Sequence, residues 1–168
     1  GQALDLSIQN IPQLGGSSLI LVDTSGSMTG FGYSAKSTIT PLAQAALFGA
    51  ALTKSGQDVT VRVFANYTKD FVFPKGTSVM KATDTLVKSA GDVGHGTEIG
   101  AALNTWNGED RVFILTDMQT RGYVSRVGSG YGYGHTAGGS NIPKHVPIYG
   151  YNLAGYDKTL AEPEKNFY

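Results

Sequence analysis

Two aspartates follow apolar runs of the sequence, and hydroxyl side chains lie beside the first of them. Asp23 comes directly after the run 18–22 and opens the segment Asp23-Thr24-Ser25-Gly26-Ser27, and Asp117 follows the run 111–116. Alternate side chains of extended backbone point the same way, so the D-x-S-x-S spacing aims one carboxylate and two hydroxyls together. Burying a carboxylate at a strand end is costly unless a cation or hydrogen bonds compensate. The pattern therefore predicts a cation site.

A third hydroxyl, that of Thr97, follows the flexible segment Gly94-His95-Gly96 at the start of a predicted helix. The candidate donors are all oxygen atoms, and they belong to Asp23, Ser25, Ser27, Thr97 and Asp117. Such a set suits a hard cation, with Mg²⁺ as the first choice and Ca²⁺ or Mn²⁺ as alternatives, and leaves a position for water or an incoming ligand. Taken singly, each residue also fits a helix cap or a turn.

Apolar runs that alternate with amphipathic ones must position these donors. Helices are predicted at 40–54, with Thr40 as N-cap, at 83–89, and at 97–106, with Thr97 as N-cap. Strands are predicted at 18–22, 59–64, 71–73, 111–116 and 146–151, with a hairpin turn at 65–67. This order indicates an α/β fold with a mostly parallel sheet and one antiparallel edge strand. Ligands of open α/β sheets bind beyond the carboxyl ends of the strands, where both aspartates lie.

The composition excludes several classes of protein. The 168 residues suffice for one domain, and 13 basic residues balance 13 acidic ones. A neutral chain lacks the positive field of an electrostatic nucleic-acid binder. The absence of cysteine excludes thiolate metal sites and cysteine nucleophiles. No apolar run is long enough to span a bilayer and no signal-peptide core is present, so we expect a cytoplasmic protein without membrane contact.

Glycine is concentrated late in the chain, where it makes up seven of the 18 residues 122–139. The stretch has neither strand nor helix periodicity, so we predict a long surface loop at 121–141. Its basic and aromatic side chains could stack on single-stranded RNA, and a flexible loop with exposed aromatics is the alternative. The residues concerned are Arg121, Tyr123, Arg126, Tyr131 and Tyr133.

The segments Leu21–Met28, Gly96-Thr97 and Leu115–Asp117 resemble the von Willebrand factor type A domain and its metal-ion-dependent adhesion site. The resemblance covers nearly the whole chain. It implies a Rossmann-like sheet of strand order 3-2-1-4-5 with helices on both faces. It also implies that the two serines and Thr97 contact the metal, and that the two aspartates do so directly or through water.

A narrower resemblance links the chain to the C-terminal A domain of Ro autoantigen (TROVE-module) proteins. It is carried by segments 3–6, 96–103, 110–112, 115–119 and 151–156. It implies that residues 1–168 form a single A domain at the C-terminal end of a longer protein, whose helical ring binds small noncoding RNA. Two departures stand out: Glu98 replaces a frequent aspartate, and the helix expected after the last strand is missing or very short.

We expect a binding module rather than an enzyme. A partner protein would supply a carboxylate to the metal, and RNA would bind only through the rest of the longer protein. One alternative is a hydrolase in which the metal activates water, with His95 or Glu98 as the candidate base. Another is direct RNA contact through the glycine-rich loop.

Overall fold

The structure is a computed structural model, and it describes residues 2–30, 39–118, 123–125, 136–154 and 168. Its helices are α1 Gln2–Ser7, α2 Pro41–Lys54, α3 Val79–Lys88 and α4 Ile99–Leu103, with short 3₁₀ helices η1 Ile8–Asn10 and η2 Gly26–Thr29. Its strands are β1 Ser17–Asp23, β2 Asp58–Phe64, β3 Thr68–Asp70, β4 Arg111–Thr116, β5 Tyr123–Ser125, β6 Thr136–Gly139 and β7 Ile148–Asn152.

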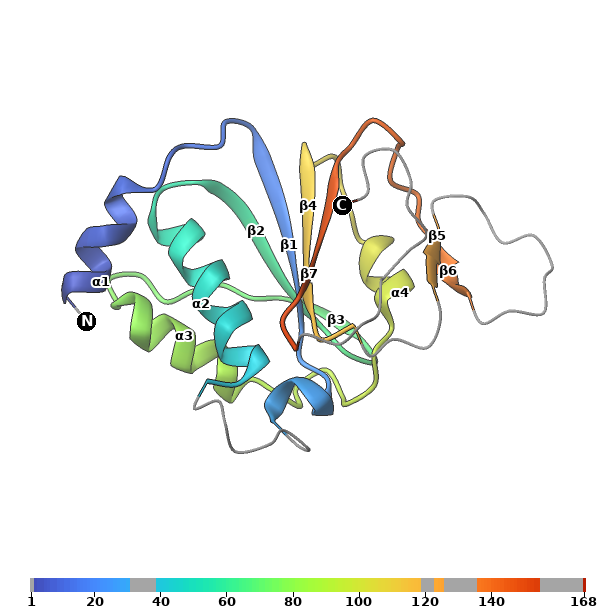
Figure 1. Cartoon of the computed structure of the whole chain (residues 1–168), viewed down its shortest axis with the longest axis horizontal. Helices are drawn as coiled ribbons and strands as arrows, with labels where there is room; N and C mark the ends of the chain where they lie inside the picture. Colours follow the sequence, from blue (N-terminus) through green and yellow to red (C-terminus); the bar gives the residue numbers. More distant parts are fainter. Residues whose placement is uncertain (1, 31–38, 119–122, 126–135, 155–167) are drawn as a thin grey trace.

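Five of these strands form the central sheet, in the order β3-β2-β1-β4-β7. β1 pairs in parallel with β2 and β4, β4 pairs in parallel with β7, and β3 is the antiparallel edge strand. The predicted fold class and strand order are therefore confirmed. Figure 1 shows α1, α2 and α3 on one face of the sheet and α4 on the other.

Strand β1 lies at the centre of the sheet and is buried on both faces. Ile20 and Val22 belong to the core on the side of α2 and α3, whereas Leu19 and Leu21 belong to the core on the side of α4. All four side chains are fully buried, and burial of a large aliphatic side chain contributes about 1.5–3 kcal/mol. Burial on both faces explains why the run is continuously apolar.

Capping residues set where helices α2 and α3 begin. Thr40 accepts a hydrogen bond from the Ala43 amide, and Pro41 is the first helical residue of α2, as predicted. Helix α3 begins at Val79 rather than at residue 83, because the Ser78 hydroxyl accepts a hydrogen bond from the Lys81 amide and caps it.

The predicted strand 71–73 is wrong, since the edge strand is β3 at Thr68–Asp70. The Phe71 amide still donates a hydrogen bond to the Val61 carbonyl. Buried and exposed side chains alternate over residues 71–73 although these residues form no strand. Phe73 enters the core on the side of α2, whereas Val72 is 82% exposed. The last strand likewise begins at Ile148, after Pro147, instead of at residue 146.

The prediction of a loop without strands in the glycine-rich region is wrong in part. β5 and β6 pair in parallel to form a second, two-stranded sheet. Pairing of strands this short rests on backbone hydrogen bonds and requires no alternation of apolar side chains. Of the five predicted RNA-contacting residues, Arg121, Arg126, Tyr131 and Tyr133 lie outside the described residues, and only the backbone of Tyr123 is described.

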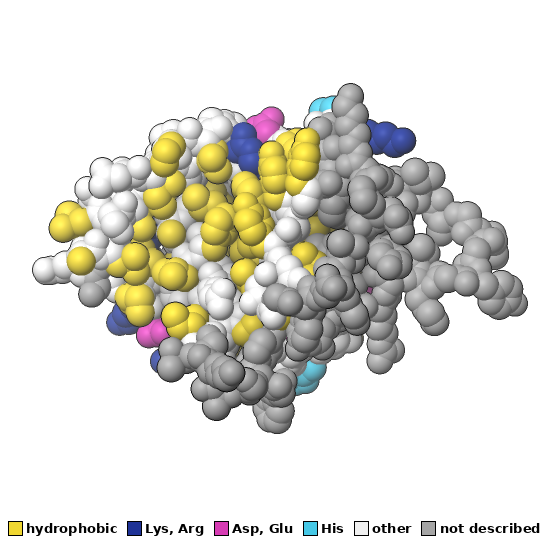
Figure 2. All heavy atoms as spheres, viewed as in Figure 1, with side chains coloured by type: hydrophobic (Ala, Val, Ile, Leu, Met, Phe, Trp, Pro, Cys, Tyr) yellow, Lys and Arg dark blue, Asp and Glu magenta, His cyan; other side chains and the backbone are white. Residues whose placement is uncertain are grey.

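Hydrophobic side chains gather on the face that carries α2 (Figure 2). Beside this helix, aromatic rings of β4 and β7 pack on one another, with 5.3 Å between the centroids of Phe113 and Tyr149. Tyr149 also stacks on Tyr168, and Phe48 of α2 contacts Phe113 edge to face. Within the described parts of the chain, no helix has the length and apolar character needed to cross a membrane.

Candidate metal centre

Asp23 ends the central strand β1, and its side chain is fully buried. Its Oδ1 atom accepts a hydrogen bond from the Ser25 amide at 2.8 Å, and its Oδ2 atom accepts one from the Thr116 hydroxyl at 2.7 Å. Burial raises the pKa of Asp23 to about 6; the hydrogen bonds from Thr116 and Ser25 oppose this shift, and the charge of Asp117 adds to it.

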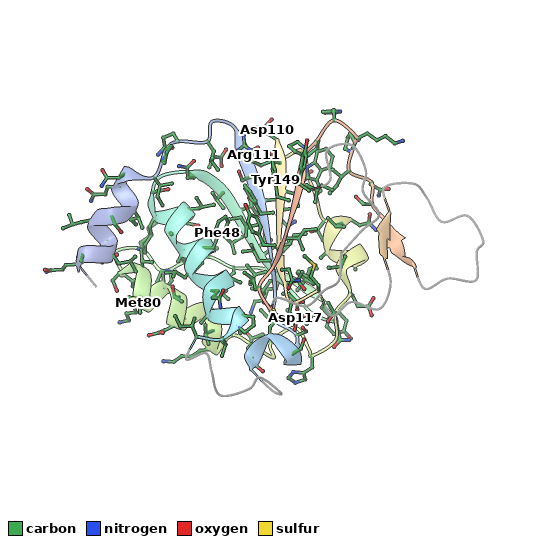
Figure 3. The ribbon with its side chains drawn as sticks, viewed as in Figure 1. Phe48, Met80, Asp110, Arg111, Asp117 and Tyr149 are labelled. Atoms are coloured by element: carbon green, nitrogen blue, oxygen red, sulfur yellow. The ribbon has the colours of Figure 1, made fainter. Side chains whose placement is uncertain are left out.

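Asp117 lies directly after β4, the strand next to β1, and is also fully buried. Figure 3 shows it at the end of the sheet where η2 begins. Its Oδ2 atom accepts no hydrogen bond from the described part of the chain, although the residue has other interactions. The next residue, Met118, has a left-handed backbone with φ of 62°, and its amide bonds to the Thr116 hydroxyl.

The two predicted serines lie beside Asp23. Ser25 is buried and Ser27 is half-buried, and their hydroxyl oxygens are 3.3 Å apart. The loop that carries them is fastened to β2, because the amide and the hydroxyl of Thr24 both donate to the Phe64 carbonyl. The D-x-S-x-S segment therefore brings its carboxylate and two hydroxyls into one cluster, although Ser27 lies in the 3₁₀ helix η2 and not in the extended backbone that the prediction assumes.

Thr97 is half-buried in the loop that precedes α4, and its predicted role as helix N-cap is wrong. The helix begins at Ile99, and Glu98 occupies the N-cap position without a side-chain hydrogen bond. The Glu98 amide instead donates to the Ala65 carbonyl, which holds the chain outside the helix. The Gly26 amide donates to the His95 carbonyl at 3.2 Å, so the Thr97 loop lies against the serine loop.

This donor set fits a hard divalent cation. Two buried carboxylates repel each other, and hydroxyl oxygens surround one of them. The described residues include no group of three or more His, Cys, Asp or Glu side chains that could hold a metal. The site therefore depends on two carboxylates and neutral oxygens, a composition that suits a cation that keeps part of its water. The assignment of the five residues as ligands stays a prediction.

Sequence reasoning missed two residues at this site. Thr116 is the last residue of β4, as predicted, and its hydroxyl also joins Asp23 to the Met118 amide. Asn66 lies in the predicted turn between β2 and β3, and its side chain also holds the loop before Thr97. A hydroxyl at the end of an apolar strand was the one available signal for Thr116, and no local pattern indicates the long-range contact of Asn66.

No family model and no curated protein matches the sequence. A solved structure, that of the Ro (RSR) protein of Deinococcus radiodurans, is similar in fold, with a TM-score of 0.61 and 15% sequence identity. The match covers 96% of this chain and 32% of that protein, so this chain spans about a third of the length of that protein. The likeness supports a common α/β fold.

Proposed function

We propose that the carboxyl ends of β1 and β4 bind a divalent cation, Mg²⁺ in the first instance, and that the bound cation recruits a partner protein. The observation that carries this proposal is the pair of fully buried carboxylates, Asp23 and Asp117, at the ends of neighbouring parallel strands. Burying each charge costs several kcal/mol, and the hydrogen bonds that Asp23 accepts offset only part of that cost.

A cation at this site would offset that cost and would offer a coordination position to an oxygen of the partner. Ser25, Ser27 and Thr97 would hold it through their hydroxyls, with Asp23 and Asp117 supplying the negative charge. Thr116 orients the Asp23 carboxylate through its hydrogen bond to Oδ2. The partner group that best complements such a site is a carboxylate of an aspartate or glutamate side chain.

Binding is favoured over hydrolysis because no described side-chain hydrogen bond holds either candidate base toward the carboxylates. His95 and Glu98 both have exposed side chains, and their described hydrogen bonds use backbone atoms. Hydrolysis requires a base within reach of the attacking water. The resemblance to the Ro family and the fold shared with part of a longer Ro protein support a place for this domain in a ribonucleoprotein. RNA would then bind elsewhere in the longer protein.

Calorimetric titration with Mg²⁺ tests the cation site. The wild type should bind one ion, and Asp23→Ala should bind at least about 100-fold more weakly, because no hydroxyl replaces the lost charge. Asp110→Ala, at the opposite end of the sheet, is the matched control and should bind normally. Unchanged affinity in Asp23→Ala would refute the proposal.

The recruiting role requires a second test. A protein captured by the immobilised chain in Mg²⁺ should be released by EDTA and should not bind Asp23→Ala. Phosphatase or phosphodiesterase turnover with Mg²⁺ or Mn²⁺, lost in Asp23→Ala, would instead favour the hydrolase.

A further inference from the structure

We infer that Asn66 is the positioning residue that fixes the Thr97 loop against the serine loop and so controls cation affinity without supplying a ligand. The inference rests on the proposed function for its cation readout. Asn66 lies in the turn between β2 and β3, and none of the motifs that predict the metal site includes it.

The Asn66 side chain binds two successive amides of the loop before Thr97. Its Oδ1 atom accepts hydrogen bonds from the amides of His95 and Gly96, each at 3.0 Å. Its own amide donates to the Val93 carbonyl at 3.0 Å. Asn66 therefore holds the loop at Val93, His95 and Gly96, and Gly96 is adjacent to Thr97.

Two glycines of the loop make room for this side chain. A Cβ atom at Gly96 would lie 2.5 Å from the Asn66 Nδ2 atom, and one at Gly94 would collide with the Asn66 Oδ1 atom. Gly94 also has a φ of 93°, a conformation that other residues rarely adopt. The Gly-His-Gly segment, which the sequence presents as merely flexible, is thus shaped to admit Asn66.

The same turn also reaches the serine loop. The carbonyl of Phe64, the last residue of β2, accepts a hydrogen bond from the Thr24 amide, and the Ala65 carbonyl accepts one from the Glu98 amide. The two loops meet where the Gly26 amide donates to the His95 carbonyl. Residues 64–66 are thus the common support of both loops. Among the described contacts of these three residues with the Thr97 loop, the two bonds to Asn66 Oδ1 are the ones that a side-chain substitution can remove.

Position matters at such a site because Mg²⁺ demands near-ideal octahedral geometry. A supporting shell that lets a ligand move by about 1 Å is enough to weaken a binding site. If the side-chain bonds of Asn66 are lost, backbone bonds alone hold the loop, and the distance of the Thr97 hydroxyl from Asp23 and the serines varies more.

The test compares three variants by Mg²⁺ calorimetry and by amide hydrogen exchange. Asn66→Ala should bind Mg²⁺ about five- to tenfold more weakly, the equivalent of one or two lost hydrogen bonds, and the amides of His95 and Gly96 should exchange faster. Asn66→Asp keeps an acceptor for both amides, so it should restore slow exchange; because its added charge also attracts the cation, amide exchange and not affinity is the deciding measurement for this variant. Asn104→Ala removes a similar bond, from the Asn141 amide to Asn104 Oδ1, and should change neither readout.

Gly96→Ala provides an independent route to the same displacement. Its Cβ would push the Asn66 side chain away, so it should weaken Mg²⁺ binding in the wild type but add little in the Asn66→Ala background, where the colliding atoms are absent. This non-additivity separates a steric contact with Asn66 from a general loss of loop stability. Far-UV circular dichroism must show that each variant is folded.

The outcomes separate the two proposals. Wild-type Mg²⁺ binding with equal affinity in Asn66→Ala would overturn this inference and leave the proposed function standing. Absence of Mg²⁺, Mn²⁺ and Ca²⁺ binding by the wild type would overturn both. Faster exchange and weaker binding in Asn66→Ala, with recovery of slow exchange in Asn66→Asp, would establish the positioning role.

Discussion

Asp23 and Asp110 lie at opposite ends of the central strands, and their hydrogen bonds are of the same kinds. Asp110 precedes β4, and its Oδ2 atom accepts the Ser17 amide at 2.7 Å and the Ser17 hydroxyl at 3.1 Å. Asp23 likewise accepts one amide and one hydroxyl. Figure 3 places Asp110 at the end of the sheet remote from Asp117.

The two carboxyl groups nevertheless differ in pKa. Hydrogen bonds from the Ser17 amide and hydroxyl, with a smaller contribution from Arg111, lower the pKa of the exposed Asp110. Burial raises the pKa of Asp23 to about 6 despite its hydrogen bonds. Hydrogen bonds to an amide and a hydroxyl thus favour the ionised form of Asp110 in the folded state. At Asp23 similar bonds only reduce the cost of burying the charge. A carboxylate kept under such a penalty is the better candidate for function.

The largest effect is expected from Asp23→Asn in the metal-free protein. The raised pKa means that Asp23 favours the folded state below its ordinary pKa of 3.8, and that this contribution disappears as the pH rises through about 6. The Oδ1 atom of the introduced asparagine can still accept the Ser25 amide, and its Nδ2 atom can donate to the Thr116 hydroxyl, so both contacts remain without the charge. At pH 8 in EDTA, Asp23→Asn should therefore raise the free energy of unfolding by about 2 kcal/mol, as measured by urea denaturation. The gain should vanish near pH 4, and a variant that is less stable at pH 8 would contradict the assignment.

A somewhat smaller effect is expected from Gly16→Ala at the other end. A Cβ atom there would lie 2.5 Å from Asp110 Oδ2, and Gly16 has a φ of 67°. The variant should lose about 1 kcal/mol of stability. Gly15→Ala is the matched control, because Gly15 has a φ of 62° with no atom near its Cβ position. Equal losses in the two variants would show that the Asp110 contact contributes nothing.

Removal of the metal should have a modest effect on stability. A cation at ten times its Kd stabilises a protein by about 1.4 kcal/mol, which corresponds to a few degrees in Tm. EDTA should lower the Tm of the wild type by that amount and leave Asp23→Asn unchanged. The far-UV spectrum should not change in either case, because the cores on both faces of the sheet do not involve the metal site. Loss of helix or strand signal on chelation would show that the fold depends on the metal.

The smallest effect is expected from Asp110→Asn, since this carboxylate is exposed. Because its pKa is lowered, the Asp110 carboxylate stabilises the folded state at pH values above its ordinary pKa of 3.8. This contribution is lost as the pH falls through the lowered pKa. The variant should be slightly less stable than the wild type at pH 7 and equal to it near pH 2, the reverse of Asp23→Asn. Mg²⁺ affinity should not change. A stability difference that persists at pH 2 would point to lost packing rather than lost charge.

Local sequence patterns were sufficient for the elements buried on both sides. The continuous apolar runs at β1 and β4 predict interior strands, because a parallel strand covered on both faces has no polar side. Thr40 and Pro41 mark the start of α2 for equally local reasons. Patterns failed where burial and pairing differ: residues 71–73 alternate because Phe73 packs in the core, although the strand has already ended at Asp70.

The sequence by itself determined the chemistry of the candidate site: two carboxylates and three hydroxyls, placed at strand ends and before a helix. Only the tertiary structure decided how they are held. The bonds from Thr116 to Asp23, from Gly26 to His95 and from two loop amides to Asn66 join residues far apart in the chain. Such contacts arise from the way the sheet brings β1, β2 and β4 side by side, and the periodicity of a single segment carries no information about its partners.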